Sequence, residues 1–128
     1  MSAAVLKKWH SLSKARDVGG LGSILAEDAV FHSPVVHTPQ VGKELTEKYL
    51  AAAFLTLFND SFKYVREIVG EGEAMLEFVV ELDGIHVNGV DIITWNENNQ
   101  ITDFKVMVRP FKAIDVIRER MVQGLKSL

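Results

Sequence analysis

Hydrophobic residues recur at helical spacing in three segments of the chain. Residues 2–16 place Val5, Trp9 and Leu12 on one face, at spacings of four and three. Residues 43–58 carry a wider apolar face, which suggests a helix that is buried on two sides. The last segment begins with a proline, which the first turn of a helix tolerates. Its predicted apolar stripe consists of Phe111, Ile114, Ile117, Met121 and Leu125.

Shorter elements are predicted between the first two helices. Asp17 suits the N-cap of a short second helix, because its carboxylate can accept hydrogen bonds from the free amides of a new turn. Residues 28–33 form a predicted strand that ends at Pro34. Pro39 and Gly42 then mark a loop.

Four strand-like runs follow, at residues 61–69, 74–82, 85–95 and 100–109. Glycine, aspartate and asparagine residues separate them, as in hairpin turns. Consecutive hairpins form an antiparallel meander. Helices segregated onto one face of such a sheet make an α+β architecture, and the sequence predicts one such domain over residues 1–128.

Side chains alternate between the two faces of these strands. In the second strand, apolar residues face one way and acidic residues the other. In the third strand both faces are apolar, with Val87 and Ile93 on one and Val90 and Ile92 on the other. A second layer must cover the outer face, and a second copy of the chain is a reasonable candidate. We therefore expect a homodimer that forms through the outer face of the sheet.

Four short motifs, in this order of elements, resemble the nuclear transport factor 2-like superfamily, in particular its SnoaL-like polyketide cyclase and ketosteroid isomerase branch. The motifs are LAEDAVFHSP at residues 25–34, GKE at 42–44, GVDII at 89–93 and VMVRP at 106–110. The resemblance covers nearly the whole chain. It implies a cone-shaped, cystatin-like bent antiparallel sheet packed against the N-terminal and central helices, with an internal apolar pocket. It does not identify the reaction, because this fold hosts enzymes, carriers and protein-binding modules.

Asp91 is the leading candidate for a catalytic residue. It falls in the apolar row of Val87, Ile93 and Trp95, where a carboxylate must be hydrogen-bonded or take up a proton. The resemblance places it where ketosteroid isomerases keep a protonated aspartic acid that donates to an oxyanion. The alternative is that the strand twists there, so that Asp91 reaches water or a backbone amide.

Two histidines, His32 and His86, are further catalytic candidates, because a neutral histidine near Asp91 can act as a general base. Strand alternation, however, points His32 to the face opposite its neighbour Ser33. The histidines, including His37, match no metal-site spacing, so we expect neither a metal ion nor a cofactor.

The resemblance also suggests residues that contact a ligand. Ser33 matches the isomerases' general base, but a serine hydroxyl is no base at neutral pH, so we expect little or no ketosteroid isomerisation. Trp9 stands where the isomerases carry a phenol, and its alternative role is core packing. Tyr49 contacts the ligand or completes the core, and Arg109 pairs with a carboxylate ligand or a nearby aspartate. The predicted ligand-binding set is Trp9, Ser33, Tyr49, Phe54, Phe78, Val87, Phe104, Val106 and Val108.

Composition excludes several classes of function. The 128 residues include no cysteine, so a disulfide and a thiolate metal site are excluded. The formal charge is −3 and the 14 basic residues are scattered, so no nucleic-acid partner is expected. The N-terminus has no apolar run long enough for a signal peptide or a membrane span. We therefore expect no membrane partner and a cytoplasmic location.

Three functions remain open. The first is an enzyme of the isomerase, cyclase or dehydratase type, in which Asp91 and a histidine transfer a proton on a small apolar carbonyl or polyol compound. The second is a non-catalytic, dimeric module that binds a small apolar molecule. The third, a protein-interaction scaffold, is least favoured because nothing marks an exposed peptide groove. Identifying the ligand and then testing turnover separates the first two.

Overall fold

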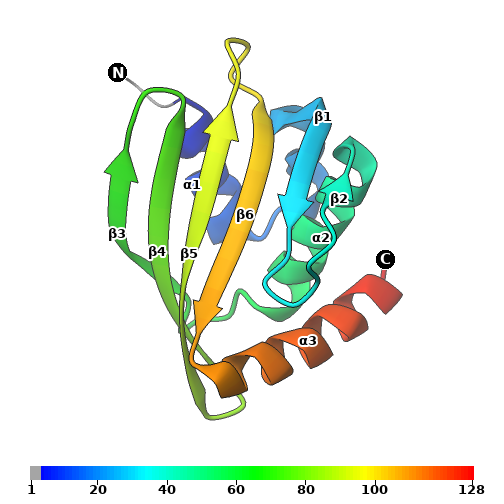
Figure 1. The fold of residues 1–128 in the computed structure, drawn as a ribbon, viewed down its shortest axis with the longest axis vertical. Helices are drawn as coiled ribbons and strands as arrows, with labels where there is room; N and C mark the ends of the chain where they lie inside the picture. Colours follow the sequence, from blue (N-terminus) through cyan, green and yellow to red (C-terminus); the bar gives the residue numbers. More distant parts are fainter. Residues whose placement is uncertain (1–3) are drawn as a thin grey trace.

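The computed structural model describes residues 4–128, which form three α-helices, one 3-10 helix and six strands (Figure 1). The first predicted helix began at Ser2, which lies outside the described residues. The predicted bounds of the four meander strands hold to within two residues. In chain order the elements are α1 (Ala4–Ala15), η1 (Val18–Ile24), β1 (Leu25–His32), β2 (Gln40–Val41), α2 (Lys43–Thr56), β3 (Lys63–Val69), β4 (Glu73–Leu82), β5 (Ile85–Trp95), β6 (Ile101–Arg109) and α3 (Phe111–Lys126).

The six strands form one bent sheet in the order β2-β1-β6-β5-β4-β3. The meander from β3 to β6 is antiparallel as predicted, whereas β1 pairs with β6 in parallel. Figure 1 shows α1 and α2 behind the sheet and α3 across its lower end. The helices therefore cover one face of the bent sheet and its lower end, which is the α+β arrangement that the sequence predicts.

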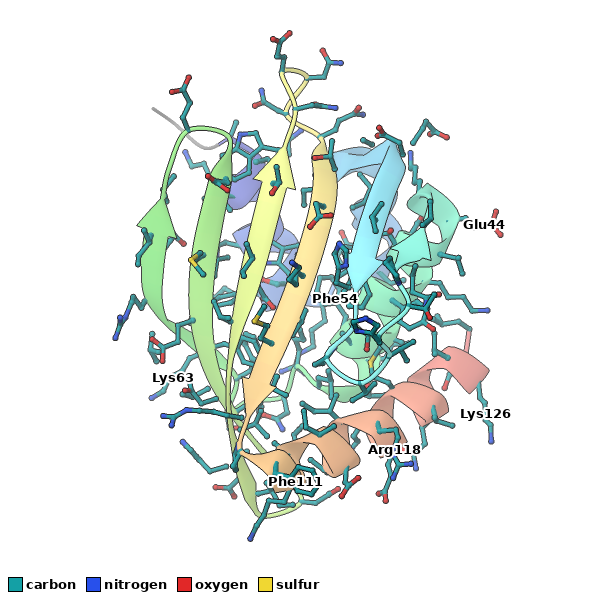
Figure 2. The ribbon with its side chains drawn as sticks, viewed as in Figure 1. Glu44, Phe54, Lys63, Phe111, Arg118 and Lys126 are labelled. Carbon is teal, nitrogen blue, oxygen red and sulfur yellow. The ribbon has the colours of Figure 1, made fainter. Side chains whose placement is uncertain are left out.

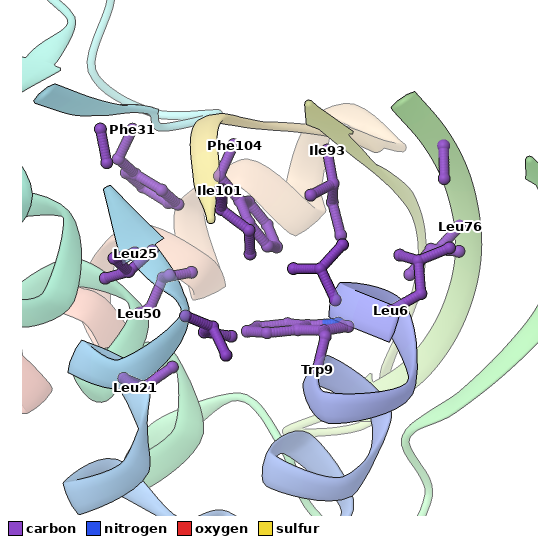
Figure 3. Close-up of a cluster of buried hydrophobic side chains, with 14 of the residues drawn as sticks. Leu6, Trp9, Leu21, Leu25, Phe31, Leu50, Leu76, Ile93, Ile101 and Phe104 are labelled. Carbon is purple, nitrogen blue, oxygen red and sulfur yellow. The ribbon is translucent and has the colours of Figure 1, made fainter. Parts of the chain in front are cut away.

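Alternation along the strands places the core on this concave face. Leu76, Phe78 and Val80 of β4 are buried there, whereas Glu81 is exposed. Trp9 projects from α1 into the same layer and packs against Phe104, with ring centroids 4.9 Å apart (Figure 3). The core thus joins the first helix to the last strand.

Several local predictions need correction. The predicted strand 28–33 begins earlier, at Leu25, because Leu25 and Ala26 are buried as part of the strand. The predicted loop before α2 contains the two-residue strand β2, in which Val41 pairs with Val30. Asp17 does cap η1: its Oδ1 accepts from the Gly20 amide at 3.2 Å.

The buried face of α3 also differs from the predicted stripe. Phe111 is 87% exposed at the start of this helix (Figure 2). A Cβ at Gly124 would come 2.9 Å from the carbonyl oxygen of Ala52, so the backbones of α3 and α2 touch there. This close approach sets the rotation of α3. The helix buries Ala113, Val116, Ile117, Met121 and Gly124.

No helix within residues 4–128 combines the length and the apolar character that a membrane crossing requires.

Candidate functional site

A narrow, mostly apolar pocket lies between the concave face of the sheet, α2 and α3. The space inside it that the centre of a water molecule can occupy is only about 50 Å³. Its polar lining side chains are Trp9, Ser33 and Asp91. The remaining lining consists of Phe31, Pro34, Leu50, Ala53, Leu57, Phe58, Phe62, Phe78, Val80, Leu82, Val87, Phe104, Val106, Val108, Ile117 and Met121.

Asp91 contributes to the pocket wall from β5. It is on the inner face of β5, between Leu76 of β4 and Val106 of β6. Its side chain is almost completely buried, with 4% exposure for the residue. The structure thus places Asp91 among apolar neighbours, as the alternation along this strand predicts.

A tyrosine supports this carboxylate. The Tyr64 hydroxyl of β3 donates to Oδ2 of Asp91 at 2.6 Å. The indole N–H of Trp9 in turn donates to the Tyr64 oxygen at 3.0 Å. Because an indole can only donate, the hydroxyl proton of Tyr64 is directed to Asp91, and the chain of hydrogen bonds has one polarity.

Burial controls the ionisation of this pair. Desolvation raises the pKa of Asp91 from 3.8 to about 7, and the hydrogen bond from Tyr64 partly opposes this rise by favouring the charged form. Burial, followed by the neighbouring charge of Asp91, raises the pKa of Tyr64 well above 10.0. Tyr64 therefore stays protonated while Asp91 exchanges a proton near neutral pH, which is the property of an efficient general acid or base.

The second oxygen of Asp91 faces the free space. Within residues 4–128 no hydrogen bond reaches Oδ1. In this part of the chain, every side-chain nitrogen or oxygen that is fully shielded from solvent has a hydrogen-bond partner, so Oδ1 is not fully shielded. Oδ1 is therefore open to the pocket, where a bound molecule can meet it.

Aromatic rings form one flat wall of the pocket. Phe58 and Phe62 stack with centroids 4.0 Å apart, and Phe62 and Phe78 stack at 5.1 Å. A Cβ at Gly89 would overlap the Phe78 ring and come 2.8 Å from the carbonyl oxygen of Met107. Only glycine at this position lets the Phe78 ring lie across β5, so Gly89 shapes the wall next to Asp91.

Ser33 lies where the chain leaves β1. Its Oγ accepts from the Val35 amide at 3.1 Å, in a tight turn that begins after His32. The hydroxyl proton is not used by this contact. Ser33 therefore offers the pocket a hydrogen-bond donor.

Among the predicted ligand-binding residues, the structure brings seven to the pocket lining and leaves two in the core. Phe54 packs beside Trp9 behind the sheet, with centroids 5.3 Å apart (Figure 2). Tyr49 packs on Phe31 at 5.5 Å. The seven that line the pocket are Trp9, Ser33, Phe78, Val87, Phe104, Val106 and Val108.

The structure does not bring the predicted histidines to Asp91. His32 points to the outer face of the sheet, where its Nε2 lies 2.8 Å from Oδ1 of Asp103. His86 is exposed near the start of β5. Arg109 donates from Nε to Asn88 at 2.9 Å, and not to an aspartate. Among residues 4–128, Asp91 is thus the only acid or histidine in the lining of the pocket.

Sequence reasoning missed Tyr64, which contributes to the site from the edge strand. The available signal was its spacing: Tyr64 and Phe62 alternate into the same face as Phe78, to which Tyr64 is paired across the strands. A tyrosine on an otherwise apolar face usually finds a partner for its hydroxyl. No group of three or more His, Asp or Glu side chains that could hold a metal ion occurs in the described part of the chain.

Comparisons with known proteins agree with this architecture. The model of the SnoaL-like domain matches residues 6–104. A steroid delta-isomerase from Pseudomonas aeruginosa is 35% identical, with a TM-score of 0.91 over 98% of this chain and 91% of that chain. An uncharacterised bacterial protein with a cystatin-like fold from Silicibacter pomeroyi is 27% identical, with a TM-score of 0.86 over 94% and 84%.

A more distant structure shows the fold alone. An NTF2-like protein of unknown function from Mesorhizobium loti is 17% identical, with a TM-score of 0.73 over 84% of this chain and 90% of that chain. No curated protein matches the sequence.

Proposed function

The chain belongs to the SnoaL-like domain family, and on that basis we propose that it is an acid/base enzyme that moves a proton on a small apolar compound through Asp91. The observation that carries the proposal is the position of Asp91: a buried carboxyl with one oxygen held by Tyr64 at 2.6 Å and the other open to an apolar pocket. A group whose pKa is about 7 can both take and return a proton at neutral pH.

The pocket favours a compact, flat and largely apolar substrate. Its stacked phenylalanine wall accommodates a ring, and its few polar groups can orient one oxygen. Steroid isomerisation, suggested by the name of the Pseudomonas aeruginosa protein, is not the reaction that we propose. The narrow free space and the serine at position 33 both oppose it.

Deuterium uptake into 2-tetralone, a compact ring ketone, tests the proposal without knowledge of the natural substrate. In D2O at pH 7, we expect the native protein to accelerate exchange of the hydrogens next to the carbonyl, as followed by proton NMR. Asp91→Asn should lose this acceleration by about 10²- to 10⁴-fold, the usual contribution of a positioned general base. Asp115→Asn, which alters an exposed acid of α3, is the matched control and should retain it.

A non-catalytic ligand-binding module is the second candidate. It is favoured by one observation, which is that no histidine of the described chain, residues 4–128, lines the pocket to act together with Asp91. Binding of 2-tetralone can be followed independently by fluorescence in a Trp95→Phe variant, in which Trp9 is the remaining tryptophan. Binding without any exchange would support the module and contradict the enzyme.

A further inference from the structure

The pocket lining contains three polar side chains, and the hydrogen bonds divide their roles. The indole N–H of Trp9 is engaged with Tyr64 at 3.0 Å, so it is not free for a ligand. Oδ2 of Asp91 is held by Tyr64 at 2.6 Å. Two polar groups then remain for a bound molecule: Oδ1 of Asp91 and the hydroxyl of Ser33.

The direction of the hydrogen bonds decides which oxygen of Asp91 carries the mobile proton. Trp9 can only donate, so Tyr64 must donate to Oδ2, and a proton taken up by Asp91 resides on Oδ1. A proton on Oδ2 would face the proton of Tyr64. The acid/base oxygen is therefore the one that faces the pocket.

The geometry of Ser33 makes its hydroxyl a donor. Its Oγ accepts from the Val35 amide at 3.1 Å, and this contact orients the oxygen while its own proton stays available. An amide that donates to Oγ also withdraws charge from it, which strengthens the hydroxyl as a donor. Ser33 cannot act as the base, but it can stabilise negative charge on a ligand oxygen.

We propose that Ser33 is a catalytic residue that holds the carbonyl oxygen of the substrate while Oδ1 of Asp91 removes a proton from the adjacent carbon. This inference rests on the proposed function and narrows the substrate class to ketones, aldehydes or esters that carry a hydrogen on the carbon next to the carbonyl. Polyols without a carbonyl are then excluded as substrates.

The proposed step balances in both directions. Oδ1 takes the proton, the C–H electron pair becomes a carbon–carbon double bond, and the carbonyl electron pair moves to oxygen. The Ser33 hydroxyl donates a hydrogen bond to that oxygen. On the return, the electrons move back and a carbon of the enolate takes the proton from Oδ1, at the original carbon or at a conjugated one. No oxidant, reductant or water is consumed.

An infrared measurement tests the Ser33 contact independently of catalysis. The carbonyl stretch of 2-tetralone labelled with ¹³C at the carbonyl should move to lower frequency in the native protein than in hexane. Ser33→Ala should abolish most of this shift and Ser33→Thr should retain it. Ser23→Ala, which removes an exposed hydroxyl of η1, is the matched control and should leave the shift unchanged. A full shift in Ser33→Ala would overturn the proposal.

The exchange rate supplies the second readout. Ser33→Ala should lower turnover of 2-tetralone by about 10²- to 10³-fold, as expected for loss of one oxyanion donor, with little change in its binding constant. Equal exchange rates in Ser33→Ala and the native protein would contradict the role of Ser33. If the native protein shows the infrared shift but catalyses no exchange, the Ser33 contact stands and the proposed enzymatic function fails.

Discussion

On the inner face of β5, Asp91 lies among apolar side chains, whereas on the outer face Val90 and Ile92 are only half-buried. Two methionines of the neighbouring strands extend that outer surface: Met75 is 42% exposed and Met107 is 52% exposed. The inner face of β5 therefore carries an ionisable group where burial disfavours its charged form. The outer face of the same strand carries apolar side chains that are partly exposed to water.

The two faces differ in how this mismatch is resolved. Inside, Tyr64 and Trp9 satisfy one oxygen of Asp91, and the other oxygen is left to the pocket. Outside, nothing within residues 4–128 covers Val90 and Ile92 completely. On both faces, residues unsuited to their surroundings indicate where the molecule interacts. On the inner face that interaction is with a ligand or substrate, and on the outer face we expect it to be with a partner.

Asp91→Asn should have the largest effect on stability, and it tests the inner face. The folded protein keeps a proton on Asp91 up to pH about 7, whereas the unfolded chain releases it near 3.8. The free energy of unfolding therefore falls as pH rises between these values and then levels off. Three pKa units at about 1.4 kcal/mol each correspond to about 4 kcal/mol.

Asparagine cannot ionise, yet its oxygen can still accept from Tyr64. We expect Asp91→Asn to be similar to the native protein at pH 4 and more stable by up to about 4 kcal/mol at pH 8, as measured by urea unfolding. Both proteins contain the same histidines. The contribution of these histidines to the pH dependence therefore cancels when the two free energies of unfolding are subtracted at each pH. A difference that does not change from pH 4 to pH 8 would show that Asp91 is not desolvated.

A lysine on the outer face should have a small effect on the fold and a large one on assembly. We propose that two copies of the chain pair through Val90 and Ile92, and Ile92→Lys places a charge at the centre of that surface. The substitution should cost the isolated chain about 1 kcal/mol, because half-buried Ile92 loses apolar contacts and the new charge lies across from Lys105. Light scattering at micromolar concentration should give a dimer mass for the native protein and a monomer mass for Ile92→Lys.

Val122→Lys is the control for this experiment, because Val122 is an exposed apolar residue on α3, away from the sheet. It should leave the dimer intact. A monomer mass for the well-folded native protein would show that two copies of the chain do not pair through the outer face.

The architecture could be predicted from sequence because it depends on local patterns. Alternation along β4 and β5 and the hairpin turns between them identified the meander, and the short motifs identified the family. The buried face of α3 was predicted only in part: Ile117 and Met121 are buried as expected, whereas Phe111 is exposed. The rotation of this helix depends on the close approach of Gly124 to Ala52, two residues that lie far apart in the sequence.

The same contrast between local patterns and distant contacts explains why only part of the candidate site was predicted. The position of Asp91 follows from alternation, which is a local property. Its partner Tyr64 lies 27 residues away, and Trp9 lies 55 residues from Tyr64, so no local pattern connects the three. Alternation also indicated that His32 faces outward, and the structure places it there beside Asp103.

Titration by ¹³C NMR shows directly whether the Asp91 carboxyl exchanges a proton near neutral pH, with the signal assigned by its absence in Asp91→Asn. We expect a midpoint near pH 7, because burial raises the pKa of Asp91 and Tyr64 only partly opposes this rise. Tyr64→Phe should move the midpoint higher still, since the carboxylate then loses its donor, whereas Tyr49→Phe should not move it. A native midpoint at or below 3.8, unchanged in Tyr64→Phe, would show that Asp91 is neither desolvated nor held by Tyr64.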